Sequence, residues 1–523
     1  MIKELPFIKS TDYKRLVFPL AVSIAAALLV HFTLYSNGLM TPDGVWRGEV
    51  SVNADYNWEV GIGRWGLFLV NLLHGGVNGH FLMAFAAVAC FALGAVLLTE
   101  VFQVKGKWKA ALVAASVTCS PMVAITLAYP YTSDGFGLSF LTAVLAVYVF
   151  AAVSNDIICI GAGILCTAIS LSLYQCNLGT QLAAAAGYIL LSLLNKPEEN
   201  KRIFVTVLKM AVAYILGFVL YYALVILFQK AWNVPMTDYK GSGSVGFSSI
   251  VSNLGPNISS AYHAFKAFFA DSWLASNAYG ERFAYAAIAA IAAVSLLLRV
   301  FRIRRYPIAI LAAVFLIIVF PLCCNITMIA VNGSGIYLIM TSGLMVTVPL
   351  LFAISDWEGP DIRRYLTKAA AILTLLLVWQ YTLTNQTDAI IMQMNKDQTV
   401  QAANRIWQRL ETEEAYVHGE TKLLIAGLLY EGSYPIVSDL YDRSNDYARW
   451  GLTWNTYDGN ANTWHEYYRR FLGIDYNMCS PEQFEQLAAL EEFEQMPVFP
   501  AAGSVRMIDD VMVVKLSEII DWY

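Results

Sequence analysis

The stretch PIAILAAVFLIIVFPLCCNITMIA, residues 307–330, contains no charged side chain and decides the fold class of this chain. A transmembrane helix needs about 20 consecutive, predominantly apolar residues to cross the hydrocarbon core of a bilayer. Residues 307–330 satisfy that length, and similar apolar runs recur on both sides of them. The sequence predicts about eleven spans, near residues 16–35, 80–103, 108–128, 135–154, 157–173, 177–194, 203–228, 283–298, 307–330, 336–355 and 366–384.

The composition supports lipid as the solvent for most of the chain. Hydrophobic residues make up 58% of its 523 residues and charged residues only 14%, with a mean hydropathy of +0.54. Soluble domains carry about 25% charged residues, so a single soluble core could not bury this much apolar surface. The formal net charge of -5 is mild, and we expect no nucleic-acid partner.

The distribution of lysine and arginine predicts the orientation, because these residues concentrate in the short cytoplasmic loops of membrane proteins. With eleven spans, the basic segments fall on one side of the membrane, at residues 3–15, 105–109, 196–202, 299–305 and 363–368. We therefore expect a cytoplasmic N-terminus and a C-terminal region on the far side. Polar, irregular segments concentrate in the far-side loops, where we expect the functional site.

The composition changes near Asn385, where the apolar runs end. Beyond it, the pattern predicts helices over residues 390–414 and 481–494. Strand candidates cover residues 423–429, 497–500, 505–508 and 511–516. We predict a mainly α protein in two parts: a transmembrane helical bundle, residues 1–384, and an extracytoplasmic α/β domain, residues 385–523.

The first far-side loop, residues 36–65, reads SNGLMTPDGVWRGEVSVNADYNWEVGIGRW. It concentrates charged and aromatic residues, namely Asp43, Glu49, Asp55, Glu59, Arg47, Arg64, Trp46, Trp58 and Trp65. Each has a structural explanation, because Pro-Asp-Gly is a common turn, tryptophans anchor helices at membrane interfaces, and arginines pair with lipid phosphate. Their density on the side that is poor in lysine and arginine favours a functional site.

Other far-side positions hold candidates of the same kind. Asp134 opens a span, either as a helix N-cap or as a second acidic group that faces the same cavity. Tyr174 and Gln175 lie at the far-side break between two spans, where polar residues face a cavity or form hydrogen bonds between helices. Arg282 lies at the mouth of a later span. The sequence has no Walker A, GxSxG or GxGxxG motif in a suitable context, so nucleotide-driven chemistry is unsupported.

Three features together point to a known family. They are the acidic first outer loop that ends in Gly63-Arg64-Trp65, the pair Tyr174-Gln175 after a span, and the tail MPVFPAAGSVRMIDDVMVVKLS, residues 496–517. In these features and in its layout the chain resembles the bacterial membrane glucosyltransferases of the serotype-converting O-antigen (Gtr) family, which belong to the GT-C superfamily. Members often have two adjacent acidic residues in the first outer loop, where this chain has only Asp43. Either Asp55 or Glu59 supplies the second carboxylate, or none is needed.

The resemblance implies an enzyme of the bacterial inner membrane that uses a polyprenyl-phosphate sugar, glucose by family analogy, and a cell-envelope glycan acceptor on the outer face. In a single inverting displacement, Asp43 would take the proton from the acceptor hydroxyl, supported by Asp55, Glu59 and Asp134. The donor phosphate would be held by Arg47, Arg64 and Arg282, because a guanidinium grips phosphate in a bidentate fashion. Further substrate contacts would come from Tyr174, Gln175, Trp46 and Trp58.

A cofactor and competing functions stay open at this point. A divalent cation, Mg²⁺ or Mn²⁺, would be held by Asp43 with Asp55 or Asp134, although no spacing demands one. A transporter or flippase for a lipid-linked or polar solute is the main alternative function, and a receptor or assembly protein is the third. The spans are nearly free of charge and show no repeat, which favours the transferase. Residues 439–443 and 450–454 either hold a glycan acceptor or belong to the C-terminal domain's own core and surface.

Overall fold

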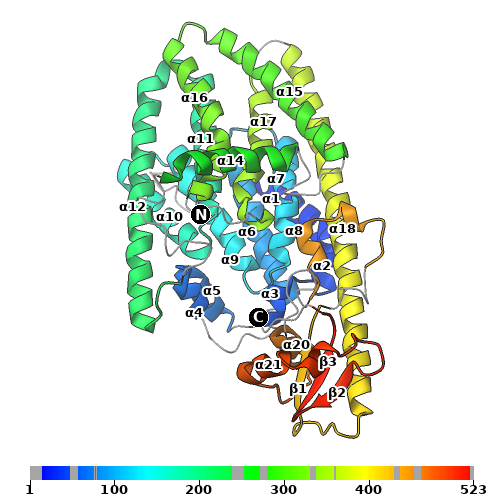
Figure 1. The fold of residues 1–523 in the computed structure, drawn as a ribbon. Coiled ribbons are helices and arrows are strands. Elements are labelled where there is room, and N and C mark those ends of the chain that lie inside the picture. The colour runs from blue at the N-terminus through cyan, green and yellow to red at the C-terminus, as the bar shows by residue number, and fades with distance from the viewer. Residues whose placement is uncertain are drawn as a thin grey trace.

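Figure 1 shows the computed structural model of the chain, which describes residues 14–47, 57–75, 77, 79–237, 252–270, 279–329, 337–358, 361–428, 436–452 and 461–518. The chain is mainly helical, with a bundle of apolar helices and a small sheet at its C-terminal end. The bundle contains α1 (Lys14–Val30), α2 (Phe32–Ser36), α6 (His80–Val101), α7 (Lys107–Thr118), α8 (Pro121–Leu127), α9 (Ser133–Ala152), α10 (Asp156–Leu173), α11 (Asn177–Asn195), α12 (Asn200–Trp232), α14 (Leu254–Phe269), α15 (Tyr279–Arg302), α16 (Pro307–Cys324), α17 (Thr347–Ser355) and α18 (Ile362–Glu411).

The apolar segments expected to span the membrane are helical. In the described part of the chain, eight helices are long and apolar enough to cross a bilayer, or nine if the bent pair α7 and α8 forms one span. Two shorter apolar helices, Arg15–Val30 and Ser342–Ser355, coincide with the first and tenth predicted spans. These helices support the prediction of a membrane protein, whereas the full count of about eleven spans stays a prediction.

The bend between α7 and α8, 52°, has a local cause in the sequence. Helix α7 ends at Thr118, and α8 begins with Pro121, which has no backbone N–H to donate to a preceding turn. Ser120 caps the new helix, because its hydroxyl accepts a hydrogen bond from the Met122 N–H at 3.4 Å. The apolar run at residues 108–128 is therefore two helices rather than one straight span.

Helix α18 joins the bundle to the C-terminal domain without a break. It continues across the predicted boundary between Thr384 and Asn385 and ends at Glu411 (Figure 1, yellow). Beyond Thr384 its buried polar side chains fix a C-terminal segment. The Asp388 carboxylate accepts hydrogen bonds from the backbone N–H and the side-chain amide of Asn445, at 2.7 and 2.6 Å, and from the Tyr447 hydroxyl at 2.9 Å. The domain boundary itself stays a prediction.

The C-terminal domain contains a three-stranded sheet in the order β1–β3–β2. Strand β1 (Lys422–Ala426) pairs parallel to β3 (Val511–Lys515), and β2 (Val505–Ile508) pairs antiparallel to β3. Every residue of the central strand β3 is buried, as expected for a strand covered on both faces. The sheet is accompanied by the short helices α20 (Ala461–Tyr467), α21 (Pro481–Ala488) and α22 (Glu491–Glu494), whereas α19 (Asp446–Arg449) packs against α18. The strands predicted at 505–508 and 511–516 are present, and residues 497–500 form no strand.

The first far-side loop is built into the C-terminal domain. Its helix α3 (Pro42–Arg47) packs against α20. Met40 and Val45 belong to the same hydrophobic cluster as Ile406 of α18 and Leu423 of β1. Asp43 therefore lies where the helical bundle and the C-terminal domain meet.

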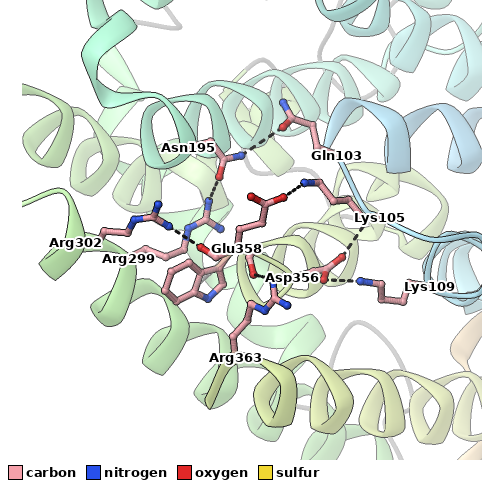
Figure 2. A network of polar contacts seen from close by, with 10 residues as sticks. Gln103, Lys105, Lys109, Asn195, Arg299, Arg302, Asp356, Glu358 and Arg363 are labelled. Carbon is pink, nitrogen blue, oxygen red and sulfur yellow. Dashed lines mark hydrogen bonds and ion pairs between the residues drawn. The ribbon is translucent and has the colours of Figure 1, made fainter. Parts of the chain in front are cut away.

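The basic loops meet at the opposite end of the bundle, where Figure 2 shows a network of polar contacts. The Lys109 ammonium lies 2.6 Å from the Asp356 carboxylate, and Lys105 pairs with Glu358. Arg299 donates to the Asn195 side chain at 2.6 Å, and the Arg302 guanidinium donates to the Glu358 carbonyl at 2.6 Å. Three of the five predicted basic segments, 105–109, 299–305 and 363–368, contribute residues to this network, and a fourth, 196–202, directly follows Asn195. These four segments therefore lie at one end of the bundle.

Candidate functional site

Helices α4 (Asn57–Gly61) and α5 (Trp65–Leu73) lie at the end of the bundle from which the C-terminal domain projects (Figure 1). Arg64 is in the turn between them. A glycine ends α4: Gly63 has φ +80°, its N–H donates to the Val60 carbonyl, and the Arg64 N–H donates to the Glu59 carbonyl. This pair of bonds is the Schellman arrangement, which needs a left-handed residue that glycine adopts without strain. The turn thus fixes where the Arg64 side chain begins.

Two aromatic rings and one amide hold the Arg64 guanidinium. Its central carbon lies 4.9 Å from the centre of the Tyr174 ring and 5.6 Å from that of Phe136. These rings stack on each other at 4.0 Å, with 17° between their planes. The Arg64 Nε donates to the Gln175 side-chain carbonyl at 3.1 Å. Cation–π contacts and this hydrogen bond orient the planar group.

Gln175 joins this arrangement to the turn after α4 and to α12. Its amide nitrogen donates to the Ile62 carbonyl at 2.8 Å and to the Tyr221 hydroxyl of α12 at 3.1 Å. The predicted break between two spans is present, since α10 ends at Leu173 and α11 begins at Asn177. Of the two explanations open from the sequence, Gln175 makes hydrogen bonds between helices.

The two terminal nitrogens of Arg64 have no hydrogen-bond or ion-pair partner among the residues that the structure describes. The side chain is half-buried. A cation withdrawn from water without a counter-charge is unfavourable, and an anionic ligand would offset that cost. The free edge of a guanidinium matches a phosphate or carboxylate with two parallel N–H donors.

Tyr129 is within electrostatic reach of both Asp43 and Tyr174, the ring that supports Arg64. Asp43 is the second residue of α3, and its negative charge acts on Tyr129 in the loop before α9. Burial raises the pKa of Tyr129 well above its usual value, and the charge of Asp43 raises this pKa further. Tyr174, which supports Arg64, lies within electrostatic reach of the same Tyr129. Tyr129 was not among the residues selected from the sequence, although it lies only five residues before Asp134.

Asp134 lies at the edge of this group. It is the second residue of α9, and its carboxylate accepts a hydrogen bond from the Gly135 N–H at 2.8 Å, as in a simple helix start. Two residues later, Phe136 stacks on Tyr174. Asp134 is also within electrostatic reach of His74, whose Nε2 lies 3.2 Å from the Asn71 side-chain oxygen. The N-cap of α9 is Thr132, so Asp134 lies in the first turn of the helix and is not its N-cap. The role of Asp134 as a second acidic group stays a prediction, and His74 is added to its surroundings.

For the remaining predicted residues, the structure gives at most their burial or the helix on which they lie. Asp55 lies outside the described residues, and for Trp46 and Arg47 the structure describes the backbone in α3 but not the side chains. Trp58 is exposed, whereas Glu59 is buried, with 2% of its surface accessible. Arg282 is on α15, which packs mainly against α17 and α18, so it is not brought to Arg64. The structure tests none of their predicted roles.

Trp450, in the predicted stretch 450–454, is buried. Trp450 is 4% exposed, packs edge-on against Tyr337 at 5.7 Å, and donates from its indole nitrogen to Asp446 at 3.1 Å. A buried indole cannot offer its face to a glycan. Trp450 belongs to the hydrophobic cluster of the helical bundle rather than to the C-terminal domain's own core, and Trp454 lies outside the described residues.

Within the described ranges, no three histidine, cysteine, aspartate or glutamate side chains gather closely enough to hold a metal ion. A site that includes Asp55 falls outside those ranges. The Mg²⁺ or Mn²⁺ site suggested for Asp43 with Asp55 or Asp134 stays a prediction.

Comparison with known protein families identifies a match to this chain. The family model described as Glucosyl transferase GtrII matches residues 50–348, more than half of the chain. The matched range includes Arg64, Asp134, Tyr174, Gln175 and Arg282, and Asp43 lies just before it. No curated protein and no solved structure shows significant similarity to the chain.

Proposed function

The chain belongs to the GtrII glucosyl transferase family, and from this premise we propose that it moves glucose from a polyprenyl-phosphate donor to a cell-envelope glycan at the outer face of the bacterial inner membrane. Membership confirms the resemblance seen in the sequence. Sugar transfer by a membrane protein follows from the family and the apolar helices. The lipid-linked donor, the glycan acceptor, the outer face and a GT-C-like fold are the proposal.

The observation that supports this proposal best is the half-buried guanidinium of Arg64. It is aimed by Tyr174, Phe136 and Gln175, and its terminal nitrogens are unpaired among the described residues. The leaving group of a polyprenyl-phosphate sugar is a phosphate that gains negative charge as the glycosidic bond breaks. A pre-oriented guanidinium stabilises that charge in the transition state without reorganising.

The proposed reaction is a single displacement. The acceptor hydroxyl oxygen attacks the anomeric carbon, the bond from this carbon to the phosphate oxygen breaks, and polyprenyl phosphate leaves with the electron pair. Asp43 takes the hydroxyl proton, and Arg64 binds the phosphate. Attack opposite the leaving group inverts the anomeric configuration. Phosphate leaves readily without a strong general acid, so one carboxylate suffices.

The assay that tests the function uses the full-length protein purified into lipid, polyprenyl-phosphate [¹⁴C]glucose and a bacterial envelope glycan extract, with and without EDTA. We expect label in the glycan, with the anomeric configuration inverted relative to the donor. The EDTA arm tests the predicted divalent cation. If label stays on the donor across a panel of polyprenyl-phosphate sugars and acceptors, the result would contradict the transferase hypothesis and favour the transporter hypothesis.

The orientation gives a prediction of its own. We expect the Glu482→Cys variant, exposed on α21, to react with a membrane-impermeant maleimide added to intact cells whose outer membrane has been permeabilised. The Lys201→Cys variant, exposed at the basic end of α12, should react only after the inner membrane is opened. The eight native cysteines are buried or partly buried, so the unmodified protein gives the background. The reverse labelling pattern would place the C-terminal domain in the cytoplasm and contradict the proposal.

Gly63 provides a test of how precisely Arg64 must be placed. A Cβ atom at this position would lie 2.7 Å from the Tyr221 hydroxyl, which is the partner of Gln175. Gly63→Ala should therefore lower transfer at least about tenfold and cost roughly 1–2 kcal/mol of stability from its left-handed backbone.

Gly75 is the matched control, because it has φ +63° and an added Cβ would meet no atom of the described residues within 4 Å. Gly75→Ala should lose similar stability, measured by thermal unfolding, and keep near-normal transfer. An equal loss of transfer in the two variants would show that backbone strain, rather than displacement of Gln175 and Arg64, is responsible.

A further inference from the structure

A cavity of about 310 Å³ lies in the C-terminal domain, away from the residues assigned to sugar transfer. Three chain segments contribute its lining: Trp407 and Glu411 at the end of α18, Tyr416 and His418 in the following loop, and Ile474 and Asp475 after α20. Its volume is at the lower end of the about 300–1,000 Å³ typical of small-molecule sites. It therefore suits one or two small rings.

The wall of this cavity is aromatic. The half-buried Trp407 ring meets Tyr416 edge-on at 6.2 Å and His418 at 5.6 Å, and Tyr468 lies behind it at 5.3 Å. Tyr468 is fully buried and belongs to the domain core, which fixes the indole from behind. A rigid indole with one side anchored in a core offers the rest of its surface to a flat apolar face.

Polar groups surround this wall. Glu411 is exposed, its charge acts on Tyr416, and its carboxylate has no hydrogen-bond or ion-pair partner in the described part of the chain. Asp475 is mostly exposed, and one of its oxygens lies 3.3 Å from the His465 ring nitrogen. An aromatic surface flanked by carboxylates matches a pyranose ring, which has apolar C–H faces and a rim of hydroxyl donors.

The position of the cavity restricts what could occupy it. Trp407 lies 23 residues beyond Thr384 on a continuous helix, roughly 35 Å along its axis from the end of the last predicted span. In Figure 1 this end of α18 lies beside the sheet, at the tip of the C-terminal domain. A lipid-linked donor sugar held near the membrane cannot reach it. A glycan of several sugar units can extend from the membrane surface to this height.

We propose that this cavity, bounded by Trp407, Glu411, Tyr416, His418 and Asp475, binds a sugar ring of a long acceptor glycan at a distance from the point of transfer. The inference rests on the proposed function, because it names the acceptor as a polymer rather than a short oligosaccharide. The site would hold the chain by a distal residue and so raise its local concentration at the transfer site.

The test compares two acceptor lengths with the full-length protein in lipid nanodiscs. The acceptors are long-chain and short-chain size fractions of one envelope glycan that the unmodified protein binds. Glu411→Gln and His418→Ala change exposed side chains, so folding is expected to persist, and Trp407→Leu removes the aromatic face. We expect KM for the long fraction to rise about tenfold, with kcat and the KM for the short fraction unchanged.

Glu414→Gln is the matched control, because Glu414 is exposed three residues after Glu411 and does not line the cavity. It should leave both KM values unchanged. An equal rise in KM for both fractions, or no change in any variant, would overturn the inference.

Calorimetric titration of the long fraction into the same nanodiscs separates the two proposals. Binding that weakens in Glu411→Gln but not in Glu414→Gln, in a protein that transfers no sugar, would support the glycan site and reject the transferase. Transfer without any loss of glycan binding in the cavity variants would reject the site alone.

Discussion

Replacing Asp43 with asparagine is expected to lower sugar transfer by about 10²–10⁴-fold, the range attributed to a general base. Asparagine keeps the shape of the side chain but cannot accept the hydroxyl proton. The packing of α3 should survive, because Met40 and Val45 rather than Asp43 join the hydrophobic cluster with Ile406. The measurement is initial rate of transfer in lipid, beside the amount of folded protein recovered from the membrane.

Asp361→Asn is a suitable control for the Asp43 variant, since Asp361 is an exposed carboxylate just before α18, at the basic end of the bundle. It should transfer normally. Near-normal turnover of Asp43→Asn would remove Asp43 from the role of base. The role would then pass to Asp55 or Glu59 in the same loop, or to Asp134, which lies beside Phe136 and Tyr174.

Removing the Arg64 guanidinium should have an effect of similar size. Loss of one pre-oriented group that stabilises developing charge typically costs about 10²–10³-fold in rate. We expect that loss for Arg64→Gln, expressed mainly in kcat, and an intermediate loss for Gln175→Leu, which removes the bond that orients Nε. Arg64→Lys should not restore activity, because an ammonium cannot hold Gln175 and present two parallel donors at once.

The control for the arginine series is Arg304→Gln, at an exposed position of the basic end of the bundle. It should leave donor KM and kcat unchanged. Full activity in Arg64→Lys would mean that a point charge suffices. Full activity in Arg64→Gln would shift phosphate binding to Arg47 or Arg282, the other arginines predicted from the sequence.

Features that depend on local hydrophobicity were predictable from the sequence. Continuous apolar runs identify helices that suit a bilayer, and α9, α10 and α11 begin within two residues of their predicted positions. The same holds for β2 and β3, where two β-branched runs flank the Asp509–Asp510 turn. The family could also be recognised from the sequence, because short motifs such as Gly63-Arg64-Trp65 are visible in a single sequence.

Features that depend on which segments meet could not be predicted. The continuity of α18 across Thr384 is one example, since a change from apolar to polar composition marks where lipid ends and not where a helix ends. Trp450 is another, because the composition of an aromatic loop is the same whether its indoles are exposed or buried.

The sequence by itself determined the membrane bundle, the small terminal sheet, the clustering of basic loops and the family. These features could be predicted because burial in lipid or in a sheet produces a pattern of apolar residues along consecutive positions of the chain. Only the tertiary structure decided that Arg64 lies on Tyr174 with its terminal nitrogens unpaired among the described residues, that Asp43 shares Tyr129 with that site, and that Trp407 and Asp475 bound one cavity. These contacts join residues far apart in the chain, and their geometry is set by how whole helices pack rather than by any local pattern.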